Sequence, residues 1–453
     1  MLHSLELKNF KAFGERTRIP FAPITLIFGE NSAGKGTILQ ALYLLRVSNI
    51  SITSEKEKTK DFNMNMKKII TLAFVLAIIV PIASFIGCER VQQIVQPTVP
   101  QMEEVDGEIL VGAVYPITGP SSLAGPSVEY GIDLAVTEIN TSQHSSVKIR
   151  LITEDGQSSV EGAVEAFNKL IHQDKVPIIL GPGSSSQVQE AFPIAHQNQV
   201  VAMSPSSAAS GLSAISDFVF RTNLTTDVLI PNGVRVTQEK LRYQKVATLF
   251  DDIDLFSQTS DKELRKVLTN SGVEILTAES FQTGETDLSA QFTHIKALNP
   301  DVIFISSTVG DISNILIQGR ALGVPSDIPF IVNLTLTRDL VDAAGDAADG
   351  TITFTSWDSA ADTPGNQAFV QNYSTKYGIE PNVWAAQFYA AVHILAKGIA
   401  DAQSTDSEAI ATALAEIRDF DTILGPFSFN DVGDAVYDPI VLIVKNGEFE
   451  IFE

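Results

Sequence analysis

The sequence predicts an α/β protein with two doubly wound lobes, each built around a parallel sheet. From residue 109 onwards, apolar runs of strand length alternate with amphipathic stretches of helix length. The alternation falls into two successive series that meet near residue 227. Hydrophobic residues make up 44% of the chain and charged residues 19%, a globular composition with enough apolar material for large cores.

The first series predicts strands over 109–114, 147–153, 176–180 and 200–203, with helices over 128–139, 159–173 and 187–198. The second predicts helices over 230–240, 261–271, 287–298 and 312–322, with strands over 245–250, 273–280, 302–306 and 330–333. Repeated β-α units imply parallel sheets with helices on both faces. A ligand site in such a fold lies outside the carboxyl ends of the strands.

Composition excludes several classes of function. The chain has 31 Lys+Arg against 54 Asp+Glu and a net charge of -23, which argues against nucleic acid as a partner. A single Cys excludes an intramolecular disulfide framework and a Cys-rich metal site. The six His form no His-x-x-x-His pair. We therefore expect no metal and no cofactor, and we find no nucleophile elbow or Ser-His-Asp set that would indicate an enzyme.

The charge distribution divides the chain. Residues 1–87 hold 11 Lys+Arg and 6 Asp+Glu, whereas residues 88–453 hold the remaining 20 and 48. The change falls at an apolar run that ends just before the only Cys. We interpret the sequence as three unlike pieces joined end to end.

The first piece, residues 1–60, carries a phosphate-binding pattern. An apolar run over 24–28 leads into a Gly-rich loop with Gly29, Gly34, Lys35 and Thr37, and a helical stretch follows. Gly36 occupies the place of the magnesium-binding hydroxyl. The stretches 7–13 and 29–35 resemble the N-terminus of SMC/RecF-like ATPases over about the first 46 residues. The downstream motifs of that family are missing, so we expect a truncated, non-functional fragment; an ATP site is the alternative.

The second piece, residues 64–88, has the order of a secretory signal. A basic start at 64–68 precedes an apolar run over 69–86, and Gly87-Cys88 closes it. This ending resembles a bacterial lipobox, which implies lipidation of Cys88 and a membrane-anchored, extracytoplasmic lipoprotein. A plain transmembrane helix is the alternative. Residues 89–107, with two Pro and several Gln, are expected to form a flexible tether.

The third piece carries a second resemblance, spread in consistent order from Ile109 to the end. Six segments are similar to the type I periplasmic binding proteins, specifically the branched-chain amino-acid receptors of ABC importers: Gly112–Pro120, Asp155–Ser159, Gly181–Ser186, Ser204–Ala208, Gly345–Thr351 and Gly425–Asn430. The resemblance implies lobe one over 108–227 plus 355–435, and lobe two over 228–354 plus 436–453. Three hinge strands would let the lobes close on a ligand.

The implied function is that of a solute-binding protein, not an enzyme, which holds an amino acid or related small carboxylate and delivers it to an ABC permease. A sensory receptor with the same lobes is the alternative. ATP hydrolysis through residues 29–37 is the third possibility.

Two serine-rich loops follow predicted strands of the first lobe and are the candidate carboxylate site. The family match points to Ser185 and Ser186 at a helix start, and to Ser206, Ser207 and Ala208 after the next strand. Hydroxyl and helix-start N–H groups can hold a carboxylate without a cation. Plain helix capping explains the serines equally well.

The second lobe departs from the family pattern. Leu255-Phe256 replaces a common Tyr-Gly, the loop at Thr308 lacks the frequent Tyr, and Asn333 stands near a frequent acid. The ammonium acceptor is therefore missing or moved, and Asp252 or Asp311 could substitute, although solvated helix-start acids are the alternative. Tyr115, Phe256 and Trp357 could wall the pocket, or could simply belong to the core.

Overall fold

The computed structural model describes residues 4–7, 17–20, 108–333 and 336–452. The chain divides into two units, residues 1–101 and 102–453, and each is described by itself. In the first unit, β1 (Ser4–Leu7) pairs antiparallel with β2 (Thr17–Pro20). The predictions for Gly29, Gly34, Lys35, Thr37, Cys88 and the tether over 89–107 lie outside the described residues.

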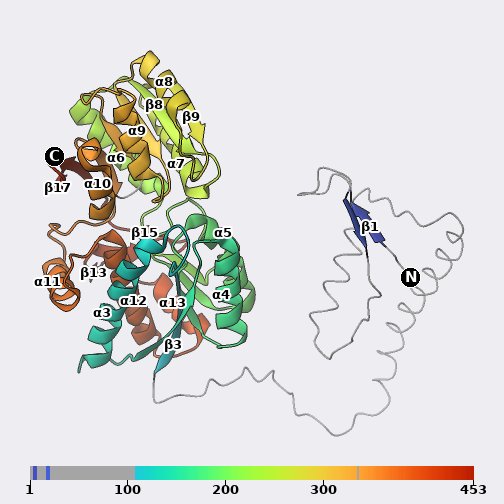
Figure 1. Ribbon diagram of the computed structural model, residues 1–453. Helices are drawn as coiled ribbons and strands as arrows, with labels where there is room; N and C mark the ends of the chain where they lie inside the picture. The colour runs from blue at the N-terminus through green and yellow to red at the C-terminus, as the bar shows by residue number, and fades with distance from the viewer. Residues whose placement is uncertain (1–3, 8–16, 21–107, 334–335, 453) are drawn as a thin grey trace, which may run out of the picture. The chain divides into compact units, whose positions relative to one another are not determined.

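The first lobe is built on a five-stranded, wholly parallel sheet with the order β4-β3-β5-β6-β7 (Figure 1). Its strands are β3 (Ile109–Tyr115), β4 (Ile149–Asp155), β5 (Ile178–Leu180), β6 (Val201–Ser204) and β7 (Val219–Arg221). On one face pack α4 (Val160–His172) and α5 (Ser185–Asn198). On the other face pack α3 (Gly125–Thr141), α12 (Val383–Ala402) and α13 (Ser407–Ala415).

The second lobe is built on a seven-stranded sheet with the order β17-β16-β12-β11-β10-β8-β9. The strands β8 (Lys245–Asp251), β9 (Glu274–Phe281), β10 (Val302–Ser306), β11 (Phe330–Val332) and β12 (Ile352–Thr355) are parallel. On one face lie α6 (Thr226–Leu241) and α7 (Leu255–Asn270), and on the other α8 (Ser289–Leu298), α9 (Ile312–Ala321) and α10 (Arg338–Ala344).

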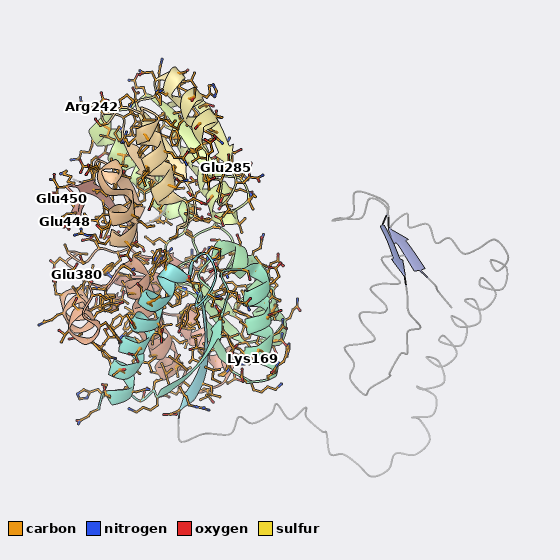
Figure 2. All side chains as sticks on the ribbon, in the orientation of Figure 1. Lys169, Arg242, Glu285, Glu380, Glu448 and Glu450 are labelled. Carbon is orange, nitrogen blue, oxygen red and sulfur yellow. The ribbon has the colours of Figure 1, made fainter. Side chains whose placement is uncertain are left out.

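The predicted α/β architecture is confirmed, but the second sheet is mixed and not wholly parallel. β16 (Ile440–Lys445) runs antiparallel to β12, and β17 (Glu448–Ile451) runs antiparallel to β16. A tight turn joins these last two strands without a crossover helix, so they cannot be parallel. Glu448 and Glu450 stand on the edge strand β17 (Figure 2), where acidic side chains discourage pairing with another chain.

Three segments carry the chain between the lobes: residues 222–225, 356–365 and 437–439. We call them the first, second and third crossings. Between the second and third crossings the chain adds to the first lobe. It forms α11 (Asn366–Tyr377), α12, α13 and a small antiparallel sheet of β13 (Phe420–Thr422), β14 (Gly425–Phe429) and β15 (Ala435–Val436).

Helix α12 is the central helix of the first lobe. Among the described helices it alone has the length and apolar composition to cross a membrane, but 67% of the tested segment is buried inside the fold. It packs closely on α3 at Gly131, where an added β-carbon would stand 2.3 Å from the carbonyl oxygen of Ala385. The apolar character of α12 therefore reflects its place in the core.

Candidate ligand-binding site

The start of α5 lacks a side-chain cap, although three serines surround it. Ser184 has the extended backbone of an N-cap residue, yet its hydroxyl accepts no bond from the first turn. Some other helices of the fold are capped: Ser159 accepts from the amide of Gly162 at 3.0 Å on α4, and Asp254 accepts from the amide of Ser257 at 2.9 Å on α7, whereas α3, α6, α8 and α9 have no side-chain cap either. Capping therefore does not explain the serines at the start of α5. The free backbone amides of this helix start suit an anion.

The two serine-rich loops lie side by side and are joined by hydrogen bonds. Ser185 is buried, and its Oγ accepts from the amides of Ala208 (3.2 Å) and Ala209 (3.1 Å). In the opposite direction, the hydroxyl of Ser206 donates to the carbonyl oxygen of Gly183 at 3.2 Å. The structure thus brings Ser185, Ser206 and Ala208 together, as the sequence predicts for loops at the ends of neighbouring parallel strands.

Ser207 differs from its neighbours because its hydroxyl is buried and unpaired. The residue is 1% exposed, and its Oγ has no hydrogen-bond partner in the structure. Its backbone amide donates to Ser204 Oγ at 3.3 Å. A buried hydroxyl without a partner costs free energy, so a ligand atom that bonded to it would recover that cost.

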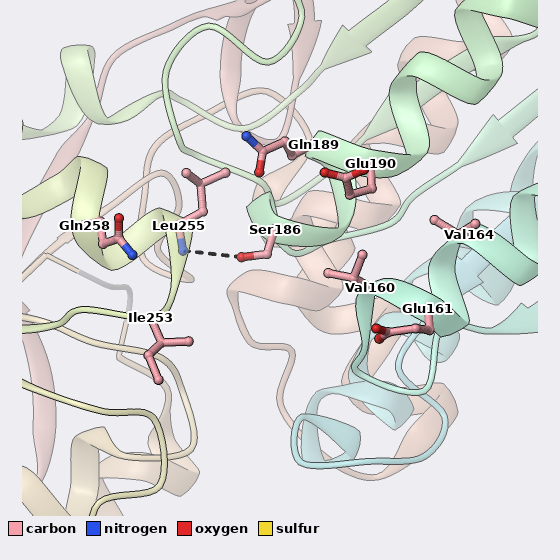
Figure 3. Close-up of a pocket in the computed structure, with 9 residues that line it drawn as sticks. All are labelled: Val160, Glu161, Val164, Ser186, Gln189, Glu190, Ile253, Leu255 and Gln258. Carbon is pink, nitrogen blue, oxygen red and sulfur yellow. Dashed lines mark hydrogen bonds between the residues drawn. The ribbon is translucent and has the colours of Figure 1, made fainter. Parts of the chain in front are cut away.

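Ser186, in the first lobe, forms hydrogen bonds with residues of the second lobe. Its hydroxyl donates to Asp254 Oδ1 at 3.2 Å. It also accepts from the amide of Leu255 at 3.3 Å, the bond drawn in Figure 3. In this arrangement its Oγ serves the start of α7. That differs from the expectation that Ser186 faces a ligand carboxylate beside Ser185.

A pocket of about 550 Å³ lies beside Ser186, on the side of α4 and α5 (Figure 3). Its lining combines apolar, amide and acidic side chains from both lobes: Val160, Glu161, Val164, Ser186, Gln189, Glu190, Ile253, Leu255 and Gln258. Two carboxylates and no cation line this pocket, so it does not suit a carboxylate ligand. Neither Ser207 nor Ala208 reaches it.

Three predicted residues of the second lobe follow the carboxyl ends of its strands β8 and β10. Asp252 is exposed in the loop between β8 and α7. Phe256 is half-buried in the first turn of α7. Thr308 is half-buried after β10, and its hydroxyl donates to Asp311 Oδ2 at 3.2 Å.

Asp311 is engaged in holding loops, which corrects its suggested role as a free ammonium acceptor. It is buried, and both its carboxylate oxygens accept from the amide of Gly284, at 3.1 and 3.2 Å. Burial raises the pKa of Asp311, and the nearby charge of Asp251 adds to the rise against the opposing hydrogen bonds. Asp251 is itself fully buried and accepts from the amides of Ile253 (2.9 Å) and Asp254 (3.3 Å).

Tyr115 and Trp357 belong to the core of the first lobe, which corrects their suggested place on a pocket wall. The side chain of Tyr115 joins those of Ile109, Val111 and Ala113 on one face of β3, against α3. Burial raises the pKa of Tyr115, and the charge of Glu129 adds to the rise. Trp357 is 5% exposed, and its Nε1 donates to Asn366 Oδ1 at 2.7 Å.

Sequence reasoning assigned no role to Asp155, which shapes the loop after β3. Its Oδ1 accepts from the amides of Ile117 (3.0 Å), Thr118 (3.2 Å) and Gln157 (2.7 Å), and its Oδ2 accepts from Thr118 Oγ1 (2.6 Å). Partial burial opposes ionisation, but these hydrogen bonds outweigh it and lower the pKa of Asp155. Its place at the carboxyl end of β4 was the available signal.

Asn333 is a second polar group that sequence reasoning treated only as a replacement. It is buried, its Nδ2 donates to Ser306 Oγ at 2.9 Å, and its Oδ1 has no partner. It therefore presents a neutral acceptor near the carboxyl ends of β10 and β11. Across the described part of the chain, no cluster of three or more His, Cys, Asp or Glu side chains could hold a metal ion.

Comparison with known proteins identifies the family. The pattern of the periplasmic binding proteins matches residues 108–446, which include the first lobe, all three crossings and the second lobe as far as β16. The chain belongs to the periplasmic binding protein family. A second pattern, that of an AAA ATPase domain, matches residues 1–202 and overlaps the first over the strands β3 to β5.

Individual relatives of this periplasmic binding protein agree with the resemblance found in its motifs. A leucine-, isoleucine-, valine-, threonine- and alanine-binding protein of Pseudomonas aeruginosa is 24% identical over 348 residues, which are 76% of this chain and 89% of the relative. The Leu/Ile/Val-binding protein BraC3 of Rhizobium johnstonii is 26% identical over 331 residues, 72% of this chain and 89% of the relative.

Solved structures show the same fold. A leucine-binding protein LivK of Thermotoga maritima superposes with a TM-score of 0.72 at 27% identity, covering 76% of this chain and 97% of the other. The substrate-binding protein LivJ of Streptococcus pneumoniae, solved in complex with isoleucine, gives a TM-score of 0.71 at 24% identity, covering 76% and 99%. The branched-chain receptor resemblance drawn from the sequence is thus confirmed.

Proposed function

We propose that this protein is an extracytoplasmic solute-binding protein that holds an amino acid or a related small carboxylate between its lobes and delivers it to an ABC permease. The observation that carries the proposal is the uncapped start of α5 beside the loop that holds the unpaired hydroxyl of Ser207. The names of the relatives, which bind leucine, isoleucine, valine and other amino acids, support the same class of ligand.

The ligand carboxylate is placed against the first turn of α5 and the loop of Ser206, Ser207 and Ala208. A carboxylate that leaves water must have its hydrogen bonds replaced, or its burial costs several kcal/mol. Helix-start amides and serine hydroxyls supply these bonds without a cation. Closure of the lobes would bring Asp252, Phe256 and Thr308 towards the other end of the ligand.

The first experiment is a thermal-shift screen of the full chain against amino acids, their amides and aromatic acids. A compound at 100 times its dissociation constant adds ~2.7 kcal/mol to the free energy of unfolding, which gives a clear rise in Tm. If no small carboxylate stabilises the protein, the proposed ligand class is wrong.

Ser207→Ala then tests the placement. A hydrogen bond to a charged group contributes ~1.5–3 kcal/mol, so we expect calorimetry to show roughly ten- to a hundred-fold weaker binding of the best compound. Ser260→Ala is the matched control, because Ser260 is also buried with an unpaired hydroxyl but lies on α7. Equal affinity in the two variants would contradict the placement.

We also propose that Cys88 is the lipid attachment site of a membrane-anchored precursor. The support is the basic, apolar and Gly-Cys order over residues 64–88. In bacterial cells fed a radioactive fatty acid, Cys88→Ser should abolish both labelling and membrane attachment. Retention of the label in this variant would refute the lipobox interpretation.

Residues 1–60 are proposed to be dispensable for export and binding. The support is Gly36 at the hydroxyl position of the phosphate-binding pattern and the missing downstream ATPase motifs. Because the AAA ATPase pattern matches this region, the test needs two arms. A gene that starts at Met64 should give the same export and binding, and ATP should not raise the Tm of the full chain. A rise in Tm that Lys35→Ala removes would revive the ATPase interpretation.

A further inference from the structure

The serine loop, residues 204–209, is hydrogen-bonded along its length to the first crossing and to the residue on either side of it. Backbone and side-chain donors of residues 221–226 reach four of its carbonyl oxygens: Thr222 N to Ser204 O (3.1 Å), Asn223 Nδ2 to Ser206 O (2.9 Å), Thr226 N to Ala208 O (2.8 Å), and Arg221 Nη1 to Ala209 O. The loop therefore cannot shift independently of this crossing without breaking buried hydrogen bonds.

Gln387 joins the first crossing to the second. It lies on α12 and is 3% exposed. Its Nε2 donates to Asn223 Oδ1 at 2.9 Å and to Ser356 Oγ at 2.9 Å, which uses both protons of the side-chain amide. The side chain of Asn223, in the first crossing, also donates to the serine loop. Through Asn223 and Gln387 the loop is therefore connected to the second crossing as well.

Tyr437 brings the third crossing into the same cluster. Its hydroxyl donates to the carbonyl oxygen of Thr222 at 3.2 Å. Burial raises the pKa of Tyr437 far above its usual range, and a hydrogen bond with Ser356 offsets part of the rise. A neutral phenol is thus held against the first and second crossings at all physiological pH values.

We propose that Gln387 is a positioning residue that couples the three crossings to the serine loop, so that the loop and the angle between the lobes change together. A hinge closes by changing backbone angles in its crossing segments. Here such a change in the first or second crossing is shared through Gln387, Asn223 and Ser356, and a change in the third crossing is shared through Tyr437, because a broken bond would leave a buried polar group unpaired. The coupling belongs to the ligand-free protein and stands apart from the identity of any ligand.

The test compares Gln387→Met with Gln291→Met in the full chain, both in a Cys88→Ser background. Gln291 is the matched control, because its Nε2 also makes two hydrogen bonds, to Ser280 O (3.1 Å) and Glu285 Oε1 (3.4 Å), while its Oε1 is unpaired. It lies on α8 in the second lobe, and none of its hydrogen bonds reaches a crossing. Methionine keeps the length of glutamine and removes only the polar amide.

Hydrogen exchange followed by mass spectrometry gives the first readout. In Gln387→Met, peptides that cover residues 204–209 and 222–226 should exchange roughly ten-fold faster or more, because the bond from Gln387 that holds Asn223 in place is lost. The control should leave these peptides unchanged and affect only residues around 280–285. Unchanged protection of the serine loop in Gln387→Met would overturn the proposal, as would a uniform rise over the whole chain.

The distance between the lobes gives the second readout. This distance would not change if Gln387 only stabilised the first lobe. Spin labels at Glu165→Cys on α4 and Thr293→Cys on α8 report this distance, because both side chains are exposed. The distribution should broaden in Gln387→Met and stay as in the parent in Gln291→Met. If Gln387→Met fails to fold, Ser356→Ala removes one acceptor of the cluster and should produce the same changes with smaller amplitude. An unchanged distribution and an unchanged serine loop in Ser356→Ala would also overturn the coupling.

Discussion

The starts of α5 and α7 approach each other across the two lobes, and their chemistry differs. At α7, Asp254 accepts from the amide and the hydroxyl of Ser257 at 2.9 and 3.0 Å. At α5, Ser184 has suitable backbone angles, but its hydroxyl accepts nothing from the first turn. The presence of a capping residue type therefore does not show that a helix is capped. The uncapped start is the one available to an anionic ligand.

The same contrast extends to the polar groups around each helix start. In the first lobe, Ser207 keeps an unpaired hydroxyl beside the loop contacts of Ser185. In the second lobe, the carboxylates of Asp251 and Asp311 are already occupied by amides of their own lobe. We infer that the first lobe sets the affinity for a ligand carboxylate, whereas the second lobe determines which ligand shapes fit.

The largest effect is expected for Ser185→Ala. Its Oγ accepts from two buried amides, and each buried donor left without a partner costs about 1–3 kcal/mol. The free energy of unfolding should therefore fall by about 2–6 kcal/mol in urea denaturation. Ser186→Ala, whose hydroxyl is only half-buried, should lose less than about 1 kcal/mol. Similar losses in the two variants would remove the distinction between these serines.

The comparison of caps predicts a second, smaller effect. Asp254→Ala removes a working cap, so the free energy of unfolding should fall by about 1–2 kcal/mol. Ser184→Ala removes no cap bond and should leave the thermal midpoint almost unchanged. A clear loss in Ser184→Ala would show that α5 is capped in solution, and the site would lose its main support.

Ser184→Asp would make the two helix starts alike. A carboxylate at this position can accept from the first-turn amides and interact favourably with the helix dipole, adding roughly 0.5–1 kcal/mol to stability. It would also occupy the place proposed for the ligand carboxylate. We expect a higher Tm without ligand and no further rise with the compounds that stabilise the parent protein. A normal ligand-induced shift would argue against the site.

The smallest effect concerns pH and Asp311. Because its folded-state pKa is raised, the native protein binds its proton more tightly than the unfolded chain does. Asp311 therefore costs stability as pH rises from its ordinary value of 3.8 through the raised value. Relative to the parent, Asp311→Asn should gain stability over this window, and the gain should then level off above it. If Asp311→Asn instead lost stability relative to the parent as pH rises, burial would not be the dominant cause of the pKa shift of Asp311.

Much of the fold was predictable because its first strands and helices are long and periodic. The strand predicted over 302–306 agrees with β10, and most helices of the two series lie where expected. Helix α7 was predicted to begin at residue 261 but begins at Leu255, since Asp254 provides a cap signal that apolar periodicity does not contain. Strands β12 to β15 have two to five residues, too few for a periodic pattern.

The site was harder to predict than the fold. Strand ends placed Ser185, Ser206 and Ala208 together correctly, because parallel strands carry their loops to one edge. The alternation along β3 could have assigned Tyr115 to the core, since it shares a face with Ile109 and Val111. The bond between Gln387 and Asn223 joins residues 164 positions apart, and no local pattern indicates such a contact.

The late position of α12 in the chain has a consequence for the order of synthesis. The five strands of the first sheet are complete at residue 221, but the helix that covers one of their faces arrives only at Val383. All five parallel strands of the second lobe are made in between. A growing chain thus makes all five parallel strands of its second lobe while the first lobe still exposes apolar residues of α3. Nascent first lobes therefore need protection from aggregation until α12 is made.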